Sequence, residues 1–146
     1  MPSLTDALTE PDKKKVIIDD CVDLLDAEVK DKGGLSGLAI KAGYSAVKGV
    51  RPGFIRQAVT DLVPEFAAAL DPIWKDGKEQ GKTTPEFFAA NSSRVADALL
   101  AITDAKAKRA KSGLVKSTYD KLRGTAKKNV EQAVPRLGKL VEKHCG

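Results

Sequence analysis

Histidine, cysteine and paired carboxylates perform most acid–base and nucleophilic catalysis, and this sequence has few of the first two. It contains one histidine and two cysteines among 146 residues. His144 and Cys145 are neighbours close to the end of the chain, where fraying is the usual behaviour, and adjacency in sequence does not orient a thiolate toward a substrate. Cys21 falls on an apolar helical stripe, which indicates a core residue. We therefore expect no catalytic residues.

Metal and nucleotide sites also lack their usual signatures. Asp19, Asp23 and Asp26 recur at helical spacing, but no histidine lies nearby and no second helix carries the Glu-x-x-His pattern,. We interpret these three carboxylates as a solvated helix face. The segment "GKTTPEF" contains Gly-Lys-Thr but lacks the preceding glycine-rich loop of a phosphate-binding motif, and no zinc-ligand spacing occurs. We expect no metal and no cofactor.

The charge of the chain is unevenly placed. Residues 101–146 contain 12 Lys+Arg against 4 Asp+Glu, a net of +8, whereas residues 1–100 contain 13 against 16, a net of −3. A basic last third indicates an anionic partner, which is either nucleic acid or the acidic surface of another protein. The other interpretations are a solvated helical surface, or a contact between the two regions within one monomer or across a homo-oligomer.

Two groups of basic residues are the candidate binding site. The first lies in "RGTAKKN", which we expect at the start of a helix, where backbone N–H groups also favour anions. The second follows a thin polar seam on "GLAIKAGYSAVKGVRPGF". The candidates are Arg123, Lys127, Lys128, Lys41, Lys48 and Arg51. Our hypothesis is that both groups lie on one face. Because aromatic side chains for base stacking are scarce, nucleic-acid binding would be weak, salt-sensitive and largely non-specific.

The elements that position these residues are expected to be helices. Hydrophobic residues make up 42% of the chain and aromatic residues 5%, and no alternating apolar runs indicate strands,. We predict an all-α fold, an irregular bundle of five to seven helices with no sheet. It forms a single domain over residues 1–146, in which 1–8 and 143–146 are flexible. No segment reaches the ~20 apolar residues of a membrane span. The N-terminus has no signal-peptide pattern, and two isolated cysteines suit a reducing cytoplasm, so we expect a cytoplasmic protein.

Particular helices follow from periodicity and from proline. The helix that starts near Ser36 is apolar almost all round, which predicts a central position in the bundle with close approach of its neighbours. Pro64 is expected to kink or break the following helix, and Asp71-Pro72 to start another short one. We further predict a polar loop at "KDGKEQGKTTP" and a long helix from Pro85 towards Lys111. Two helices are expected after Gly113, the last of them kinked at Pro135.

Three segments carry a resemblance to a known group of proteins. These are "DAEVKDKGGLSGLAIKAGYSAVKGVRPGF", "ADALLAITDAKA" and "LRGTAKKNVEQAVPRLGKLVEKHCG", the last of which is the most specific. They resemble a family of small bacterial proteins, common in actinobacteria, whose function is unassigned. The likeness covers nearly the full length. It implies a bacterial, cytoplasmic, stand-alone helical protein, and it transfers no catalytic residues.

Together these patterns favour a non-enzymatic protein. It would bind an anionic macromolecule, either nucleic acid or a protein partner, through its basic C-terminal surface. The alternative is a small-ligand carrier or an enzyme with an apolar pocket between helices, near Tyr44, Phe66 and Trp74. A cavity of ligand size in the bundle is the observation that would favour the alternative.

Overall fold

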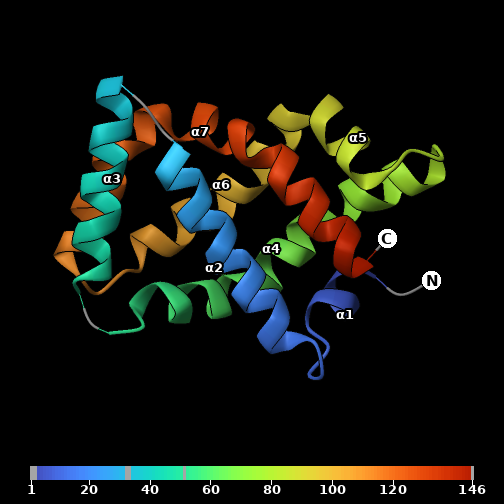
Figure 1. Cartoon of the computed structure of the whole chain (residues 1–146), viewed down its shortest axis with the longest axis horizontal. Helices are drawn as coiled ribbons and strands as arrows, with labels where there is room; N and C mark the ends of the chain where they lie inside the picture. The colour runs from blue at the N-terminus through green and yellow to red at the C-terminus, as the bar shows by residue number, and fades with distance from the viewer. Residues whose placement is uncertain (1–2, 32–33, 51, 146) are drawn as a thin grey trace.

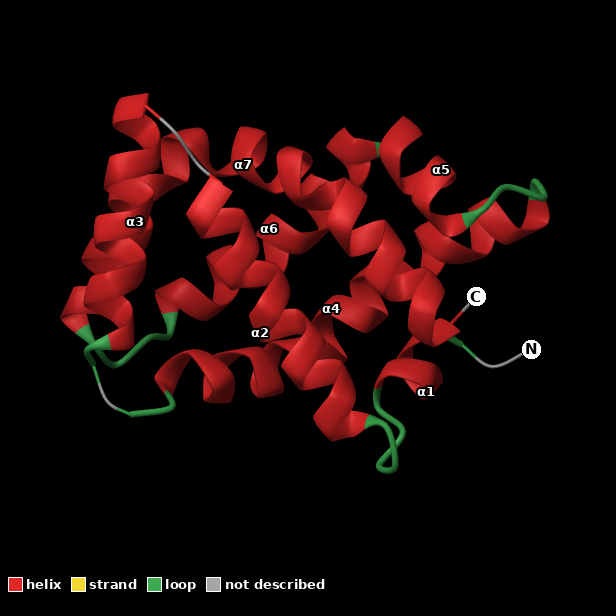
Figure 2. Ribbon diagram, in the orientation of Figure 1, coloured by secondary structure: helices red, strands yellow, loops and turns green. Residues whose placement is uncertain are grey.

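The protein folds as a bundle of helices (Figures 1 and 2). The computed structural model describes residues 3–31, 34–50 and 52–145, which contain seven helices and no strand. The all-helical class predicted from the sequence is confirmed. The helices are α1 Leu4–Leu8, α2 Lys14–Asp31, α3 Gly34–Lys48, α4 Phe54–Glu79, α5 Thr84–Ala90, α6 Ser92–Lys108 and α7 Gly113–Cys145.

Two long helices organise the bundle. The 33-residue α7 packs against α1, α2, α3, α5 and α6, and the 26-residue α4 packs against α1, α2, α3, α5 and α6. In Figure 1, α3 lies at one end of the bundle beside the start of α7, whereas α1 and α5 lie toward the other end. The shorter helices therefore gather around two long ones.

Proline does not interrupt either long helix. Pro64 and Pro72 lie inside α4, and Pro135 lies inside α7. The expected break at Pro64 and the expected new helix at Pro72 are therefore wrong, and the two helices predicted after Gly113 are one. All three prolines are exposed. The carbonyl groups that lose a hydrogen-bond donor thus lie on the outer face, where water can replace it.

The central position predicted for α3 is also wrong. This helix lies at the edge of the bundle (Figure 1), and its Leu38 is 65% exposed. Its apolar residues are mostly alanine and glycine, which bury little area each, so α3 adds little to a core. The close approach of a neighbour does occur: a Cβ added at Gly43 would lie 2.9 Å from Thr118 Cγ2 of α7.

The segment between α4 and α6 differs from its prediction at two points. Helix α4 continues to Glu79, so the loop is only residues 80–83, in which Gly81 has a φ of 69°. The helix that begins at Thr84 ends at Ala90, because Asn91 leaves helical geometry with a φ of −121°. The Asn91 side chain donates a hydrogen bond from Nδ2 to the carbonyl oxygen of Phe87, 2.9 Å away. Helix α6 then starts in a new direction.

Described residues of both terminal segments make contacts with other helices. Leu4 and Leu8 of α1 are buried, and the backbone N–H of Leu4 donates to Asp71 Oδ1 at 2.8 Å. At the other end, Lys143 Nζ lies 3.0 Å from Asp20 Oδ2 of α2. These contacts fall within the segments 1–8 and 143–146, for which we expected flexibility.

The tightest packing is at the end of the bundle where α1, α5, the second half of α4 and the second half of α7 meet, which we call the packed end. Phe88 and Leu4 are completely buried here. Glycine lets backbones approach, since a Cβ added at Gly138 of α7 would lie 2.8 Å from the Cα of Pro85 in α5. The packed end is therefore a closely filled part of the core.

Candidate functional site

A cavity of about 310 Å³ lies between α2, α4, α6 and α7, and we call it the central cavity. Helices α2 and α6 each pack against α4 and α7, so the four helices form a ring around it. Its lining is apolar apart from Thr103 and Cys21. The lining residues are Leu8, Ile17, Cys21, Leu24, Leu25, Val59, Leu62, Val63, Phe66, Ala67, Leu70, Leu99, Leu100, Thr103, Val130, Ala133, Leu137, Leu140 and Val141.

Many of these lining side chains are only half-buried. Ile17 and Val141 are excluded from solvent, whereas Leu24, Phe66 and Leu99 retain accessible surface. Apolar side chains that are neither packed nor exposed on the outside are the usual walls of a small-molecule site. The lining contains no ionisable group except the Cys21 thiol, so the cavity is suited to holding an apolar molecule rather than to acid–base chemistry.

A second, larger pocket of about 540 Å³ lies where the start of α4 meets the end of α6 and the start of α7, and we call it the α6–α7 pocket. Leu62 and Thr103 line both this pocket and the central cavity. The α6–α7 pocket also carries charge. Its cations are Lys106 and Arg109, and its carboxylate is Asp61.

The charged groups of the α6–α7 pocket differ in their partners. Lys106 Nζ lies 2.9 Å from Glu65 Oε2, with both side chains about 40% exposed. Asp61 Oδ1 accepts a hydrogen bond from Gln57 Nε2 at 2.9 Å. Arg109 is exposed and forms no ion pair with any residue that the structure describes. Its guanidinium is therefore available to an anion from outside.

A third pocket of about 270 Å³ lies between α2, α3 and α7. Tyr44 lines this pocket, Phe66 lines the central cavity, and Trp74 is buried in the packed core. The three aromatic residues that we expected around one pocket are therefore in three separate places. Tyr119 lines both the third pocket and the α6–α7 pocket, so its ring forms part of the wall between them.

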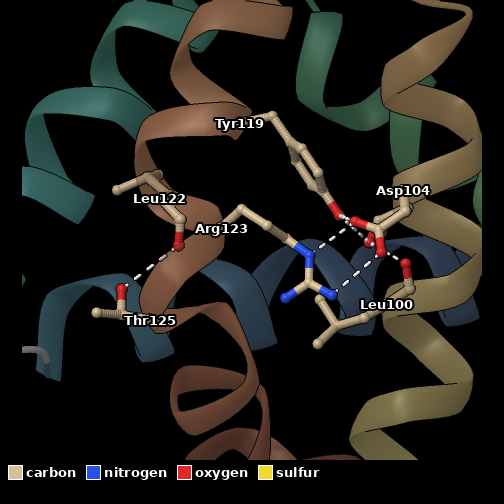
Figure 3. A network of polar contacts seen from close by, with 7 residues as sticks. Leu100, Asp104, Tyr119, Leu122, Arg123 and Thr125 are labelled. Atoms are coloured by element: carbon tan, nitrogen blue, oxygen red, sulfur yellow. Dashed lines mark hydrogen bonds and ion pairs between the residues drawn. The ribbon is translucent and has the colours of Figure 1, made fainter.

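A polar network holds that wall in place and joins α6 to α7 (Figure 3). Arg123 donates to both carboxylate oxygens of Asp104, from Nε at 2.8 Å and from Nη2 at 3.1 Å, and the Tyr119 hydroxyl donates to the same carboxylate. The hydrogen bonds from Arg123 and then from Tyr119 hold the pKa of Asp104 below its usual value,. Burial, followed by the Asp104 carboxylate, raises the pKa of Tyr119. Tyr119 therefore stays neutral and serves as a donor.

The first predicted group of basic residues is divided by these contacts. Arg123 is committed to Asp104, and Lys127 Nζ lies 3.1 Å from Asp97 Oδ1 on α6. Lys128 is exposed and has no ion pair with a described residue. Only Lys128 of this group is free to contact an outside anion without breaking an internal ion pair.

The second predicted group is divided in the same way. Lys48 Nζ lies 3.6 Å from Asp26 Oδ1 on α2 and 4.9 Å from the centre of the Tyr44 ring. Lys41 is exposed without an ion pair to any described residue, and Arg51 lies outside the described residues. Lys48 turns toward α2, whereas the paired members of the first group turn toward α6. Whether the two groups share one face stays a hypothesis.

Other basic residues of the last third also reach acids from the first 100 residues. Arg136 pairs with Glu28 and Asp31, and both Lys143 and His144 contact Asp20. This favours one interpretation that the sequence left open, that part of the charge asymmetry is used within the monomer. Sequence reasoning missed these acid partners because they lie more than 100 positions away.

The residues weighed for catalysis are engaged in structural contacts. Burial raises the pKa of the Cys21 thiol to about 11, with the Asp20 charge adding to the effect, and burial also raises that of Cys145 to about 11,. Both thiols are therefore protonated at neutral pH. The side chain of His144 is 7% exposed, and its Nε2 lies 2.7 Å from Asp20 Oδ2. It anchors the end of α7 to α2.

Two of the three α2 carboxylates that recur at helical spacing contact side chains of other helices. Arg56 Nη1 lies 2.6 Å from Asp19 Oδ1, and the Tyr44 hydroxyl donates to Asp26 Oδ1 at 2.6 Å. Within residues 3–31, 34–50 and 52–145, no three histidine, cysteine, aspartate or glutamate side chains converge as a metal site would require. None of the helices in these ranges combines the length and apolar character needed to span a bilayer.

Comparison with known proteins places the chain in a family without assigning its chemistry. No match was found among curated proteins or among solved structures. Residues 4–145 match a family of unknown function, DUF6918. This match spans all seven helices and nearly the whole sequence, and the chain belongs to that family.

Proposed function

We propose that this protein binds an apolar small molecule in the central cavity. The observation that carries the proposal is a space of about 310 Å³ whose lining is apolar except for Thr103 and Cys21. Ligand sites are typically concave and mostly apolar, with few polar groups. This is the small-ligand alternative that the sequence left open, and the cavity supports it more strongly than the surface charges support the first interpretation.

The apolar lining favours an apolar occupant over water. Each Å² of apolar surface that binding removes from water contributes about 25 cal/mol. Water is a poor filler because a buried water needs roughly two to four polar partners. The Thr103 hydroxyl already forms hydrogen bonds with the carbonyl oxygen of Leu100 and with the Tyr119 hydroxyl.

The volume sets the size of the ligand. A cavity of about 150 Å³ lined by similar side chains holds one benzene molecule. The central cavity has about twice that volume. Naphthalene, with two fused rings and no polar group, is therefore a suitable neutral probe for this space.

The test is a titration of the ¹⁵N-labelled protein with naphthalene, followed by amide chemical shifts. Binding should shift amides of α2, α4, α6 and α7 around the cavity. Ala133 lines the cavity, and Ala133→Leu should fill part of it and abolish binding. Ala101→Leu adds the same side chain on the exposed face of α6 and should bind like the unmodified protein.

Two results would contradict the proposal. One is the absence of any shift at the solubility limit of naphthalene. The other is equal binding by Ala133→Leu and Ala101→Leu, which would place the probe outside the central cavity.

A second candidate function is the binding of an anionic macromolecule by the basic last third. One observation favours it: seven of its lysines and arginines form no ion pair with described residues. They are Lys108, Arg109, Lys111, Lys116, Lys121, Lys128 and Lys139. Such a surface would bind phosphates in a salt-dependent and non-specific manner.

Duplex DNA at several salt concentrations tests this second candidate. Fluorescence anisotropy should report binding that weakens steeply with salt, and Lys128→Gln should reduce the salt slope by about one. Lys13→Gln is the matched control, because Lys13 is exposed at the opposite end of the sequence and pairs with Glu10. No binding at low salt would remove this candidate.

A further inference from the structure

We propose that the ligand is an amphiphile with a single carboxylate, whose apolar tail lies in the central cavity and whose head lies in the α6–α7 pocket beside Arg109. This inference rests on the proposed function and names the chemical class of its ligand. Three observations carry it: the shared lining residues of the two adjoining spaces, the placement of the charges, and the size of the cavity.

The first observation is that the two spaces adjoin. Leu62 of α4 and Thr103 of α6 line both the central cavity and the α6–α7 pocket. Both side chains are half-buried, so each keeps accessible surface between the two spaces. A chain molecule that enters the cavity between these two residues leaves its other end in the α6–α7 pocket.

The second observation is that cations line only one of the three pockets described above. The central cavity and the third pocket have no lysine or arginine in their linings. The α6–α7 pocket has Lys106 and Arg109. The head of an anionic amphiphile therefore has one favourable position, and its tail must point into the central cavity.

The charges within the α6–α7 pocket favour a single anionic group. Arg109 can offer two parallel N–H donors to a carboxylate. Lys106 lines the same pocket, and its side chain is partly exposed while its Nζ pairs with Glu65. Asp61 lowers the net positive charge of the pocket, which disfavours a multiply charged head such as a phosphate monoester,.

The third observation is the length of tail that fits. Benzene fills a cavity of about 150 Å³ with six carbon atoms, so about 310 Å³ holds roughly twelve at the same loading,. Decanoate, with a carboxylate on a ten-carbon chain, is therefore the probe for this inference. Decanol is its uncharged counterpart of equal chain length.

The experiment compares both probes by isothermal titration calorimetry. Charged heads are costly to bury, so an apolar cavity alone would bind decanol more tightly than decanoate. With Arg109 at the head position, decanoate should bind at least as tightly as decanol. Arg109→Gln should weaken decanoate by about tenfold and leave decanol within twofold. Asp61→Asn should tighten decanoate a few-fold by removing a like charge.

Lys111→Gln is the matched control for the change in net charge. Lys111 is exposed two residues from Arg109 and does not line the α6–α7 pocket. Its variant should bind both probes like the unmodified protein. An equal loss of decanoate affinity in Lys111→Gln and Arg109→Gln would overturn the inference, because it would indicate a general charge effect.

The results also separate this inference from the proposed function. If decanol binds but decanoate binds more weakly, or if Arg109→Gln leaves decanoate unchanged, the carboxylate assignment is wrong and the apolar site stands. If neither decanol, decanoate nor naphthalene binds, the proposed function itself fails.

Discussion

Where α5 meets the second half of α7, Phe88 is completely buried and Gly138 lets the two backbones approach closely. Where α3 and the end of α6 meet the first half of α7, side chains are half-buried and two pockets remain open. We call this second region, together with the central cavity, the hollow half; the lining of the cavity also includes residues of the packed end such as Leu70 and Val141. The two regions share one helix, α7, whose fully buried residues all lie in its second half.

The difference begins with the side chains that each region offers. The packed end has Phe87, Phe88 and Trp74, and it places glycine opposite two of its bulky residues: Gly77 opposite Phe87 and Gly138 opposite Pro85. The hollow half places small residues of α3 against α7, so little volume fills the space. The packed end is therefore more completely filled than the hollow half.

The largest test of this comparison is the same substitution in both regions. Phe88→Ala should cost about 3–5 kcal/mol of unfolding free energy, because it leaves a cavity in a filled core. Phe66→Ala should cost about 1–2 kcal/mol, because Phe66 is half-buried and already borders empty space,. Urea denaturation followed by circular dichroism measures both. Equal losses would mean that the two regions are packed alike.

Two glycine-to-alanine substitutions on α7 should change the free energy of unfolding by smaller amounts, and in opposite directions. Alanine at position 138 would bring Cβ to 2.8 Å from the Cα of Pro85, so α5 and α7 must separate. The overpacking should exceed the gain in helix propensity and cost about 1–2 kcal/mol net.

At position 124, in the hollow half, a Cβ meets nothing within 4 Å. Gly124→Ala should therefore stabilise the protein by about 0.5–1 kcal/mol. Thermal unfolding of the two variants should move the midpoint in opposite directions. A stabilising Gly138→Ala would show that the packed end has room to spare.

The smallest expected change in stability comes from the polar network of Asp104, Tyr119 and Arg123, which forms the wall between two pockets of the hollow half. Arg123 and Tyr119 lower the pKa of Asp104 in the folded protein. The ionised carboxylate therefore stabilises the fold at pH values above the pKa of Asp104 in the unfolded chain, and this stabilisation is lost as the pH falls through the lower pKa of the folded protein. Asp104→Asn should cost about 1 kcal/mol or less at pH 7, since the ion pair is partly exposed. This deficit should shrink below the ordinary value of 3.8.

Asp120→Asn is the control for this pH series. The Asp120 side chain is exposed on α7 and forms no ion pair or hydrogen bond with a described residue. Its stability should match the unmodified protein at every pH. A deficit in Asp104→Asn that persists unchanged at pH 3 would show that the carboxylate charge is not what holds the wall.

Periodicity in the sequence was sufficient to predict the helical class, but not how the helices fit. The helical stripe of Ile17, Cys21, Leu24 and Leu25 was correctly identified as apolar, yet all four residues line the central cavity rather than a filled core. A stripe tells which face turns inward; the volume left between opposing faces depends on side chains from distant segments. The 5% aromatic content was a signal of scarce filling volume.

The position of α3 and the fate of the basic residues were beyond the sequence for a related reason. Small residues allow close approach, but they do not say whether a helix is surrounded or lies at an edge. Likewise, the sequence indicates a basic surface that includes Arg123 and Arg136, but in the fold these side chains pair with acids on α6 and α2. A binding site predicted from charge alone therefore includes residues that already form ion pairs within the protein.

The long reach of α7 has a consequence for how the chain is made. It is the last of the seven described helices to be synthesised, and it contacts five of the others, with Lys143 pairing to Asp20 across 123 positions. The ring around the central cavity therefore cannot close until α7 has left the ribosome. Helical proteins with mostly local contacts fold fastest. Closing this ring joins segments more than 100 positions apart, so it is a non-local and therefore slower step of folding,.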